Sequence, residues 1–101
     1  MNRRQGYGQF CPISRAAELL TTKWTPLVIR ELYFGSTRFA DLKRGLPRMS
    51  TALLSQRLKE LEHSGILDRQ PLEYGTGYEY ELTQAGRALF PVLERMGHWA
   101  Q

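Results

Sequence analysis

Hydrophobic residues recur at two different spacings along the chain. In residues 11–62, and again after residue 83, they fall three or four positions apart, which is typical of amphipathic helices. Residues 78–82 alternate instead, with Tyr78, Tyr80 and Leu82 separated by glutamates, which predicts a strand with one apolar face. The pattern predicts an α+β, mainly α, domain over residues 11–101, while residues 1–10 lack periodicity and are expected to form a flexible N-terminal arm.

Two helices are predicted in the first third of the chain. The first begins at Cys11-Pro12, because proline is tolerated in a first helical turn, and it ends at Thr21-Thr22. The second is expected from about residue 24 to residue 34, where a glycine follows. Its helical spacing places four residues in the core: Trp24, Leu27, Val28 and Leu32.

Residues 37–62 predict two helices joined by a five-residue turn. Ser36 or Thr37 can cap the first helix, and its apolar residues Phe39, Leu42 and Leu46 point inward together. Residues 45–49 break the helix, since Pro47 cannot continue it. Ser50 caps the second helix, whose buried stripe is formed by Leu54, Leu58 and Leu61. The arrangement is a helix-turn-helix, in which the second helix is shaped to enter a DNA major groove.

A hairpin and a last helix complete the predicted fold. Two strands, residues 66–72 and 78–82, flank a glycine-containing loop at residues 74–77, and Pro71 indicates that the first strand is an edge or is interrupted. A hairpin directly after a helix-turn-helix is the layout of a winged helix, with residues 74–77 at the tip of the wing. Thr83 caps the last helix, in which Pro91 should cost about 3 kcal/mol or cause a kink.

The last helix carries more apolar surface than so small a domain can cover. Its stripe is expected to form, with the first helix, a dimer interface; the alternative is that Met96 and Trp99 fold back on their own core. The fold class is thus a winged helix-turn-helix with a C-terminal dimerisation helix. The residues assigned to the interface are Ala16, Leu19, Leu20, Leu89, Leu93, Met96 and Trp99.

Charge is distributed unevenly along the chain. Residues 1–59 contain 11 lysines or arginines and three acids, whereas residues 60–101 contain three arginines and seven acids. The basic half holds the helix pair, which suits a polyanionic partner, although a solvated basic surface with no partner is the alternative. The residues assigned to double-stranded DNA are Arg38, Lys43, Arg44, Arg48, Ser50, Thr51, Ala52, Ser55, Gln56, Lys59, Tyr74, Gly75, Thr76 and Gly77.

Several classes of function are disfavoured by what the chain contains. The only histidines, His63 and His98, have no evident reason to lie near Cys11, so we expect no Cys-His nucleophile, no metal site, no cofactor and no enzyme activity. No apolar run is long enough to cross a membrane, and a cytoplasmic location is expected. The competing interpretation is a winged-helix protein-interaction module. The polar surface of Ser55, Gln56 and Lys59 disfavours it, because protein-binding faces carry apolar anchors.

An ordered set of short motifs resembles the HxlR-type winged helix-turn-helix family of bacterial transcriptional regulators. No single motif is diagnostic, but together they span nearly the whole chain in the order of that family. They are Cys11-Pro12, Lys23-Trp24, Arg38-Phe39-Ala40-Asp41-Leu42, Met49-Ser50, Leu53-Leu54-Ser55-Gln56-Arg57-Leu58-Lys59-Glu60-Leu61-Glu62, Gly65-Ile66-Leu67, Tyr80-Glu81-Leu82-Thr83, Ala85-Gly86, Leu89 and Pro91.

The resemblance implies a homodimer, built by the first and last helices, that binds a pseudo-palindromic operator. Residues 50–62 would be the recognition helix and residues 74–77 the wing, which would lie on the flanking DNA backbone. Cys11 matches a position at which several family members carry a cysteine that senses oxidants or electrophiles. A helix N-terminus, helped by Arg15, would favour the reactive thiolate.

Two alternatives to thiol sensing follow from the same residues. Cys11 can instead be a partly buried, small apolar residue. A small ligand can also bind in the dimer cleft between aromatic residues, for which Phe10, Trp24 and Trp99 are suitable.

Overall fold

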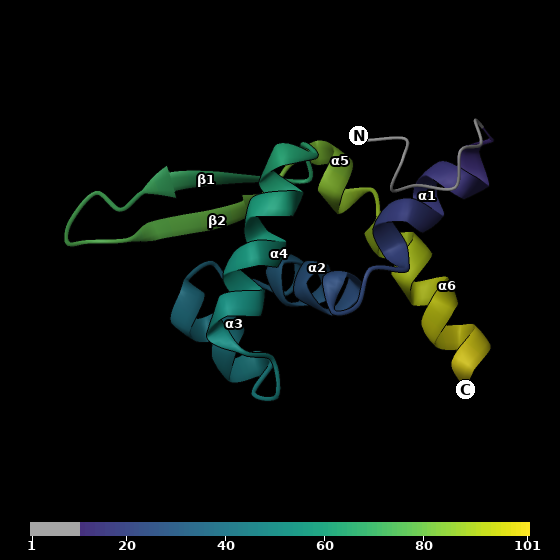
Figure 1. The fold of residues 1–101 in the computed structure, drawn as a ribbon, viewed down its shortest axis with the longest axis horizontal. Helices are drawn as coiled ribbons and strands as arrows, with labels where there is room; N and C mark the ends of the chain where they lie inside the picture. The colour runs from purple at the N-terminus through teal and green to yellow at the C-terminus, as the bar shows by residue number, and fades with distance from the viewer. Residues whose placement is uncertain (1–10) are drawn as a thin grey trace.

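A computed structural model describes residues 11–101 as a helical domain with one β-hairpin (Figure 1). The expected flexible arm, residues 1–10, lies outside the described residues. Three helices precede α4, and two strands separate it from the last two helices. The elements are α1 (Pro12–Leu20), α2 (Thr25–Tyr33), α3 (Phe39–Gly45), α4 (Thr51–His63), β1 (Leu67–Pro71), β2 (Tyr78–Leu82), α5 (Gln84–Arg87) and α6 (Phe90–Ala100).

The hydrophobic core lies where α2, α3 and α4 meet the base of the hairpin. Val28 and Leu32 are buried as predicted, and Trp24 packs against the core from its edge. The assignment of Leu27 was wrong: Leu27 is exposed, and Ile29 is fully buried in its place. The buried face of α2 therefore keeps Val28 and Leu32 but extends to the side of Ile29 and not to that of Leu27. This side is wide because α2 contacts α3, α4, α6 and β2.

The start of α3 also differs from the prediction. Its N-cap is Arg38, with no side-chain cap, so neither Ser36 nor Thr37 caps the helix. The backbone before α3 is instead used by the hairpin: the N–H of Tyr80 donates to the carbonyl of Thr37 over 2.8 Å, and Arg38 forms an isolated β-bridge with Glu79. A segment whose carbonyls pair with a strand cannot also form the first turn of a helix.

The hairpin lies where it was predicted, although β1 is one residue shorter at each end than the expected strand of residues 66–72. β1 and β2 pair antiparallel, from Leu67 opposite Leu82 to Pro71 opposite Tyr78. Together they form a two-stranded sheet, so β1 is an edge strand and Pro71, at its last position, is tolerated there. Leu82 is buried at the base of the hairpin, which anchors the wing to the core.

The predicted last helix is two helices. The hydroxyl of Thr83 caps α5 by accepting the N–H of Gly86 over 3.1 Å, as expected, but α5 ends after four residues. α6 then begins at Phe90, so Pro91 lies in a first turn, where it removes no helical hydrogen bond. The expected cost of an interior proline therefore does not arise.

α6 projects away from the remainder of the domain (Figure 1). Its first turns pack on the core, where Leu93 is half-buried and Phe90 stacks on Tyr33 with ring centroids 3.8 Å apart. Farther along, Met96 is 45% exposed and Trp99 is 88% exposed. The alternative in which Met96 and Trp99 fold back on their own core is therefore wrong for this chain.

Candidate nucleic-acid interface

Helix α4 is held to the core by one face. Ser50 accepts the N–H of Leu53 over 3.1 Å and so caps the helix, as predicted. Leu54, Leu58 and Leu61 are each 2% exposed or less. Because the stripe is enclosed, the opposite face of α4 is directed to solvent with a fixed rotation about the helix axis.

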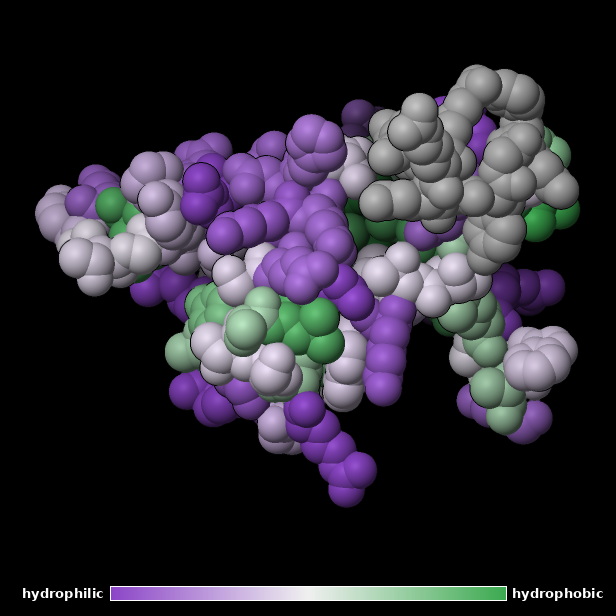
Figure 2. Space-filling view, in the orientation of Figure 1, coloured by the Kyte–Doolittle hydropathy of each residue, from purple (hydrophilic) through white to green (hydrophobic). Residues whose placement is uncertain are grey.

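That outer face has the small and hydrogen-bonding side chains that were expected of it. Thr51, Ala52, Gln56 and Lys59 are exposed, while Ser55 is half-buried. Figure 2 shows hydrophilic side chains along the upper part of α4 and at the base of the hairpin, and a hydrophobic patch lower on the same face, towards α3. Such a face can approach the edges of base pairs, since no bulky apolar side chain holds the helix away from the groove.

The cations predicted to bind phosphates are not equivalent. Arg44 pairs with Asp41, and Arg38 lies 3.8 Å from a carboxylate oxygen of Glu79. Lys43 donates to the carbonyl of Pro47 over 3.0 Å. Within residues 11–101, by contrast, Arg48 and Lys59 are exposed and take part in no ion pair, so their charge is available to a phosphate without the loss of an internal partner.

The wing is acidic apart from its tip. Residues 67–82 contain four acidic side chains against one arginine, Arg69, and the register places Asp68 directly opposite Glu81. The tip is uncharged and exposed: Gly75 and Gly77 have positive φ angles of 86° and 107°, which glycine adopts readily, and the N–H of Leu72 donates to the carbonyl of Gly77. The tip, residues 74–77, offers hydroxyl and backbone donors and has no negative charge of its own that would repel a phosphate.

Cys11 is exposed at the N-terminus of α1. Its sulfur lies 3.0 Å from the hydroxyl of Ser14 and accepts the N–H of Ser14 over 3.3 Å. The hydroxyl contact first, and the N–H contact second, lower the pKa of the Cys11 thiol. Ser14 thus has the role that was expected of Arg15, and a Cys-x-x-Ser spacing at a helix start is the sequence signal for it. The interpretation of Cys11 as a partly buried apolar residue does not fit its exposure.

The residues assigned to the dimer interface fall into two groups. Leu19, Leu89 and Leu93 pack against the core of their own chain and are only half-buried there. The others are Leu20, which is also half-buried, and Ala16, Met96 and Trp99, which are exposed. Of the aromatic residues suggested for a ligand cleft, Phe10 lies outside the described residues. Trp24 packs against the core, whereas Trp99 is exposed.

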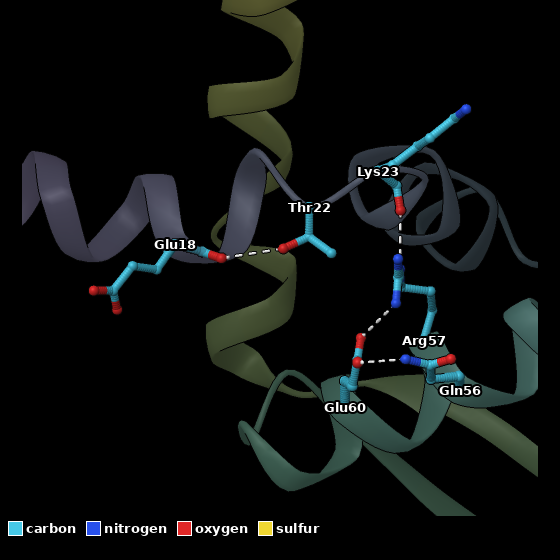
Figure 3. A network of polar contacts seen from close by, with 6 residues as sticks. All are labelled: Glu18, Thr22, Lys23, Gln56, Arg57 and Glu60. Carbon is cyan, nitrogen blue, oxygen red and sulfur yellow. Dashed lines mark hydrogen bonds and ion pairs between the residues drawn. The ribbon is translucent and has the colours of Figure 1, made fainter. Parts of the chain in front are cut away.

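Two features of the site were not predicted. Trp24, the N-cap of α2, has φ of 77°, the only positive φ of a non-glycine residue in the described part of the chain. Arg57, on α4, reaches the linker before α2 and donates to the carbonyl of Lys23 over 2.9 Å (Figure 3). A contact between residues 34 positions apart leaves no periodic signal in a sequence.

Comparisons of the sequence place it among known regulators. The family model described as HxlR-like helix-turn-helix matches residues 19–101. The chain is 38% identical over 94 residues to the HTH-type transcriptional regulator YvaP of Bacillus subtilis, which covers 91% of this chain and 87% of YvaP. It is 39% identical over 92 residues to the HTH-type transcriptional regulator YodB of the same organism, which covers 89% of this chain and 82% of YodB.

Solved structures give the same result for the fold. The reduced form of YodB from B. subtilis superposes with a TM-score of 0.79 at 37% identity, over 91% of this chain and 92% of that one. The oxidised form of the redox regulator HypR superposes with a TM-score of 0.80 at 30% identity, over 88% and 93% of the two chains. The winged helix-turn-helix fold predicted from the sequence is confirmed.

Proposed function

The chain belongs to the HxlR-like helix-turn-helix family of transcriptional regulators, and from this premise we propose that it binds a pseudo-palindromic operator as a homodimer under the control of Cys11. The observation that carries the proposal is the orientation of α4. Its leucine stripe is fully enclosed, and its exposed face presents Gln56 and Lys59 beside a capped N-terminus. This is the arrangement a helix needs to read bases in a major groove. Such a regulator would act in the cytoplasm.

The homodimer is supported by the surface of α6. Met96 and Trp99 are large apolar side chains left exposed by their own chain, and they continue the stripe that begins at Leu93. A second copy related by a two-fold axis would cover this surface and would place two α4 helices on one side of the assembly. Two-fold symmetry in the protein then requires a pseudo-palindrome in the DNA.

The operator can be found by selecting tight-binding duplexes from a random pool at about 150 mM salt. We expect enrichment of a pseudo-palindrome whose half-sites lie about one helical turn, roughly 10 base pairs, apart. If no sequence is enriched, the regulator interpretation fails, and the protein-interaction module becomes the better description of the fold.

Two substitutions separate base reading from phosphate binding. Gln56→Ala should lower the ratio of specific to non-specific affinity by about tenfold, since a bidentate base contact contributes roughly 1–3 kcal/mol. Arg48→Ala should weaken binding to all duplexes alike and reduce the salt slope by about one. Arg44→Ala, which also leaves Asp41 without its partner, serves as a comparison. The same effect from Gln56→Ala and Arg48→Ala would contradict this division.

Thiol control is supported by the chemistry of Cys11 and by two relatives. The sulfur is exposed and its pKa is lowered, so the reactive thiolate is more abundant than in an ordinary cysteine. YodB has been solved in reduced, quinone-bound and diamide-treated forms, and HypR is a redox regulator. Residues 1–101 contain one cysteine, so a disulfide between two copies would join Cys11 to Cys11. A mixed disulfide with another thiol and alkylation are the alternatives.

Cys11 can be modified in two ways, by oxidation to a disulfide and by addition to a quinone. Two Cys11 thiols can transfer two electrons and two protons to diamide and form one S–S bond between subunits. Alternatively, the thiolate adds to a ring carbon of a quinone and forms a C–S bond. The hydrogen of that carbon and one proton from water then move to the two ring oxygens, which gives a hydroquinone thioether. Both act at the start of α1, which belongs to the proposed dimer contact.

The test compares Cys11→Ser with the unchanged protein. Both should bind the selected operator equally when reduced, and only the protein with Cys11 should change its affinity after diamide or a quinone. An unchanged response in Cys11→Ser would refute thiol control and would favour a regulator that responds to a small ligand in the dimer cleft.

A further inference from the structure

Arg57 differs from the other cations of the DNA-binding region in being largely buried. Its side chain is 13% exposed, whereas that of Arg44 is 76% exposed. On α4 it lies at the edge of the leucine stripe, on the side that faces the linker between α1 and α2. Its charge is balanced by Glu60, whose carboxylate lies 3.1 Å away. A buried and paired arginine adds little to the attraction of phosphates.

The backbone atom to which Arg57 binds belongs to a linker that is held by local hydrogen bonds. Arg57 donates through Nε to the carbonyl of Lys23 over 2.9 Å. On one side of Lys23, the hydroxyl of Thr22 donates to the carbonyl of Glu18 over 3.1 Å, and on the other side Trp24 is held at a positive φ of 77° (Figure 3). The linker therefore offers a fixed acceptor, and Arg57 ties α4 to it.

From Arg57 the contacts continue to the residue proposed to read bases. The second carboxylate oxygen of Glu60 accepts the side-chain N–H of Gln56 over 3.3 Å (Figure 3). A primary amide has two N–H donors and one carbonyl acceptor. One N–H and the carbonyl of Gln56 therefore stay available, and these are the pair that a bidentate contact to adenine requires.

We propose that Arg57 is a positioning residue for base reading: anchored on the Lys23 carbonyl, it holds Glu60, and Glu60 holds the side chain of Gln56 in an orientation suited to a base edge. The inference rests on the proposed function of α4 as the reading helix. Arg57 touches no base in this scheme. Its effect is to restrict the Gln56 side chain before DNA binds, so that less conformational entropy is lost on binding.

The test replaces Arg57 by lysine, which keeps the charge but loses the planar fork that contacts two partners at once. Arg57→Lys should lower specific affinity for the selected operator by about tenfold, leave non-specific affinity and the salt slope unchanged, and thus lower the specificity ratio. The matched control is Arg30→Lys, since Arg30 also pairs with a glutamate, at 2.9 Å, but makes no contact with the linker. The control should keep the ratio unchanged.

A second variant changes Glu60, the residue that joins Arg57 to Gln56. Glu60→Gln removes a negative charge close to the proposed DNA surface, so non-specific affinity should rise while the specificity ratio falls. A purely structural role for Arg57 would lower the melting temperature but leave the ratio unchanged at a temperature well below the transition. Such a result, or an equal fall of specific and non-specific affinity in Arg57→Lys, would overturn the proposal.

A measurement without DNA separates this inference from the proposed function. The side-chain amide resonances of Gln56, followed by NMR in the free protein, should move in Arg57→Lys and in Glu60→Gln but not in Arg30→Lys. Resonances that stay in place in Arg57→Lys would refute the positioning role. If the unchanged protein binds no duplex specifically, the proposed function fails, and the amide resonances still decide whether Arg57 orients Gln56.

Discussion

Helices α4 and α6 both carry an apolar stripe, but the two stripes lie in different surroundings. The stripe of α4 is enclosed by its own chain, with Leu54, Leu58 and Leu61 at most 2% exposed. The stripe of α6 begins against the core and then leaves it, so that Trp99 is 88% exposed. The comparison shows that an apolar stripe predicts that a surface will be buried. It does not show whether the same chain or a second chain covers that surface.

The difference follows from the neighbours of each helix. α4 contacts both α2 and β1, which enclose it from two directions. α6 contacts α2 near its start and then extends past the end of the domain (Figure 1). A DNA-reading helix must have a fixed orientation within one chain, whereas a dimerisation helix must leave apolar surface uncovered until a partner arrives.

The largest effect is expected from a cavity in the enclosed stripe. Leu54→Ala should lower the free energy of unfolding by about 2–5 kcal/mol, since it removes a fully buried side chain from a packed core. Urea denaturation followed by circular dichroism measures this. Ala52→Ser, on the exposed face of the same helix, is the control. A loss below about 1 kcal/mol would mean that the stripe of α4 is not enclosed as described.

A substitution in the exposed stripe of α6 should weaken the association of two chains and have little effect on the folding of one chain. Trp99→Ala should raise the dissociation constant of the proposed dimer by about 30-fold or more, because an aromatic hot spot contributes roughly 2 kcal/mol or more. Sedimentation over a range of protein concentrations measures it, and Glu94→Ala, on the opposite side of α6, is the control. A monomer in the unchanged protein at all concentrations would contradict the dimer and with it this prediction.

The cap of α4 is expected to have a moderate effect. Ser50→Ala removes the acceptor of the Leu53 N–H and should lower the free energy of unfolding by about 1 kcal/mol. Thermal unfolding gives the value. Ser64→Ala, at the other end of α4, should cost less, since the C-terminal carbonyls need donors and not a hydroxyl acceptor. Equal losses would show that the cap does not define the start of the helix.

The smallest effect concerns chemistry at the start of α1. Ser14→Ala should raise the pKa of the Cys11 thiol, because it removes the hydroxyl that most favours the thiolate. The rate of alkylation should then reach half of its maximum at a higher pH, and alkylation at neutral pH should be slower. Iodoacetamide kinetics as a function of pH provide the measurement. A larger shift from Arg15→Ala than from Ser14→Ala would restore the role first expected of Arg15.

Errors in the sequence-based prediction occurred where long-range contacts compete with local signals. Ser36 and Thr37 are good capping residues, but the hairpin uses the Thr37 carbonyl, and the helix starts later. Pro91 was placed inside a continuous helix, although a break before Phe90 gives it a favourable first-turn position. In both cases the intrinsic preference of the residue was assessed correctly, but the contacts that it makes in the folded chain were not predicted.

The sequence by itself determined the order of the elements up to the last helix, the leucine stripe and cap of α4, and the alternating faces of β2, because helix and strand periodicity are local properties of the chain. It also revealed the surplus apolar surface of the last helix. Only the tertiary structure decided that Arg57 is anchored on the Lys23 carbonyl and that Asp68 lies directly opposite Glu81 in the wing. These facts depend on distances between side chains of different elements or across a turn, which spacing alone does not specify.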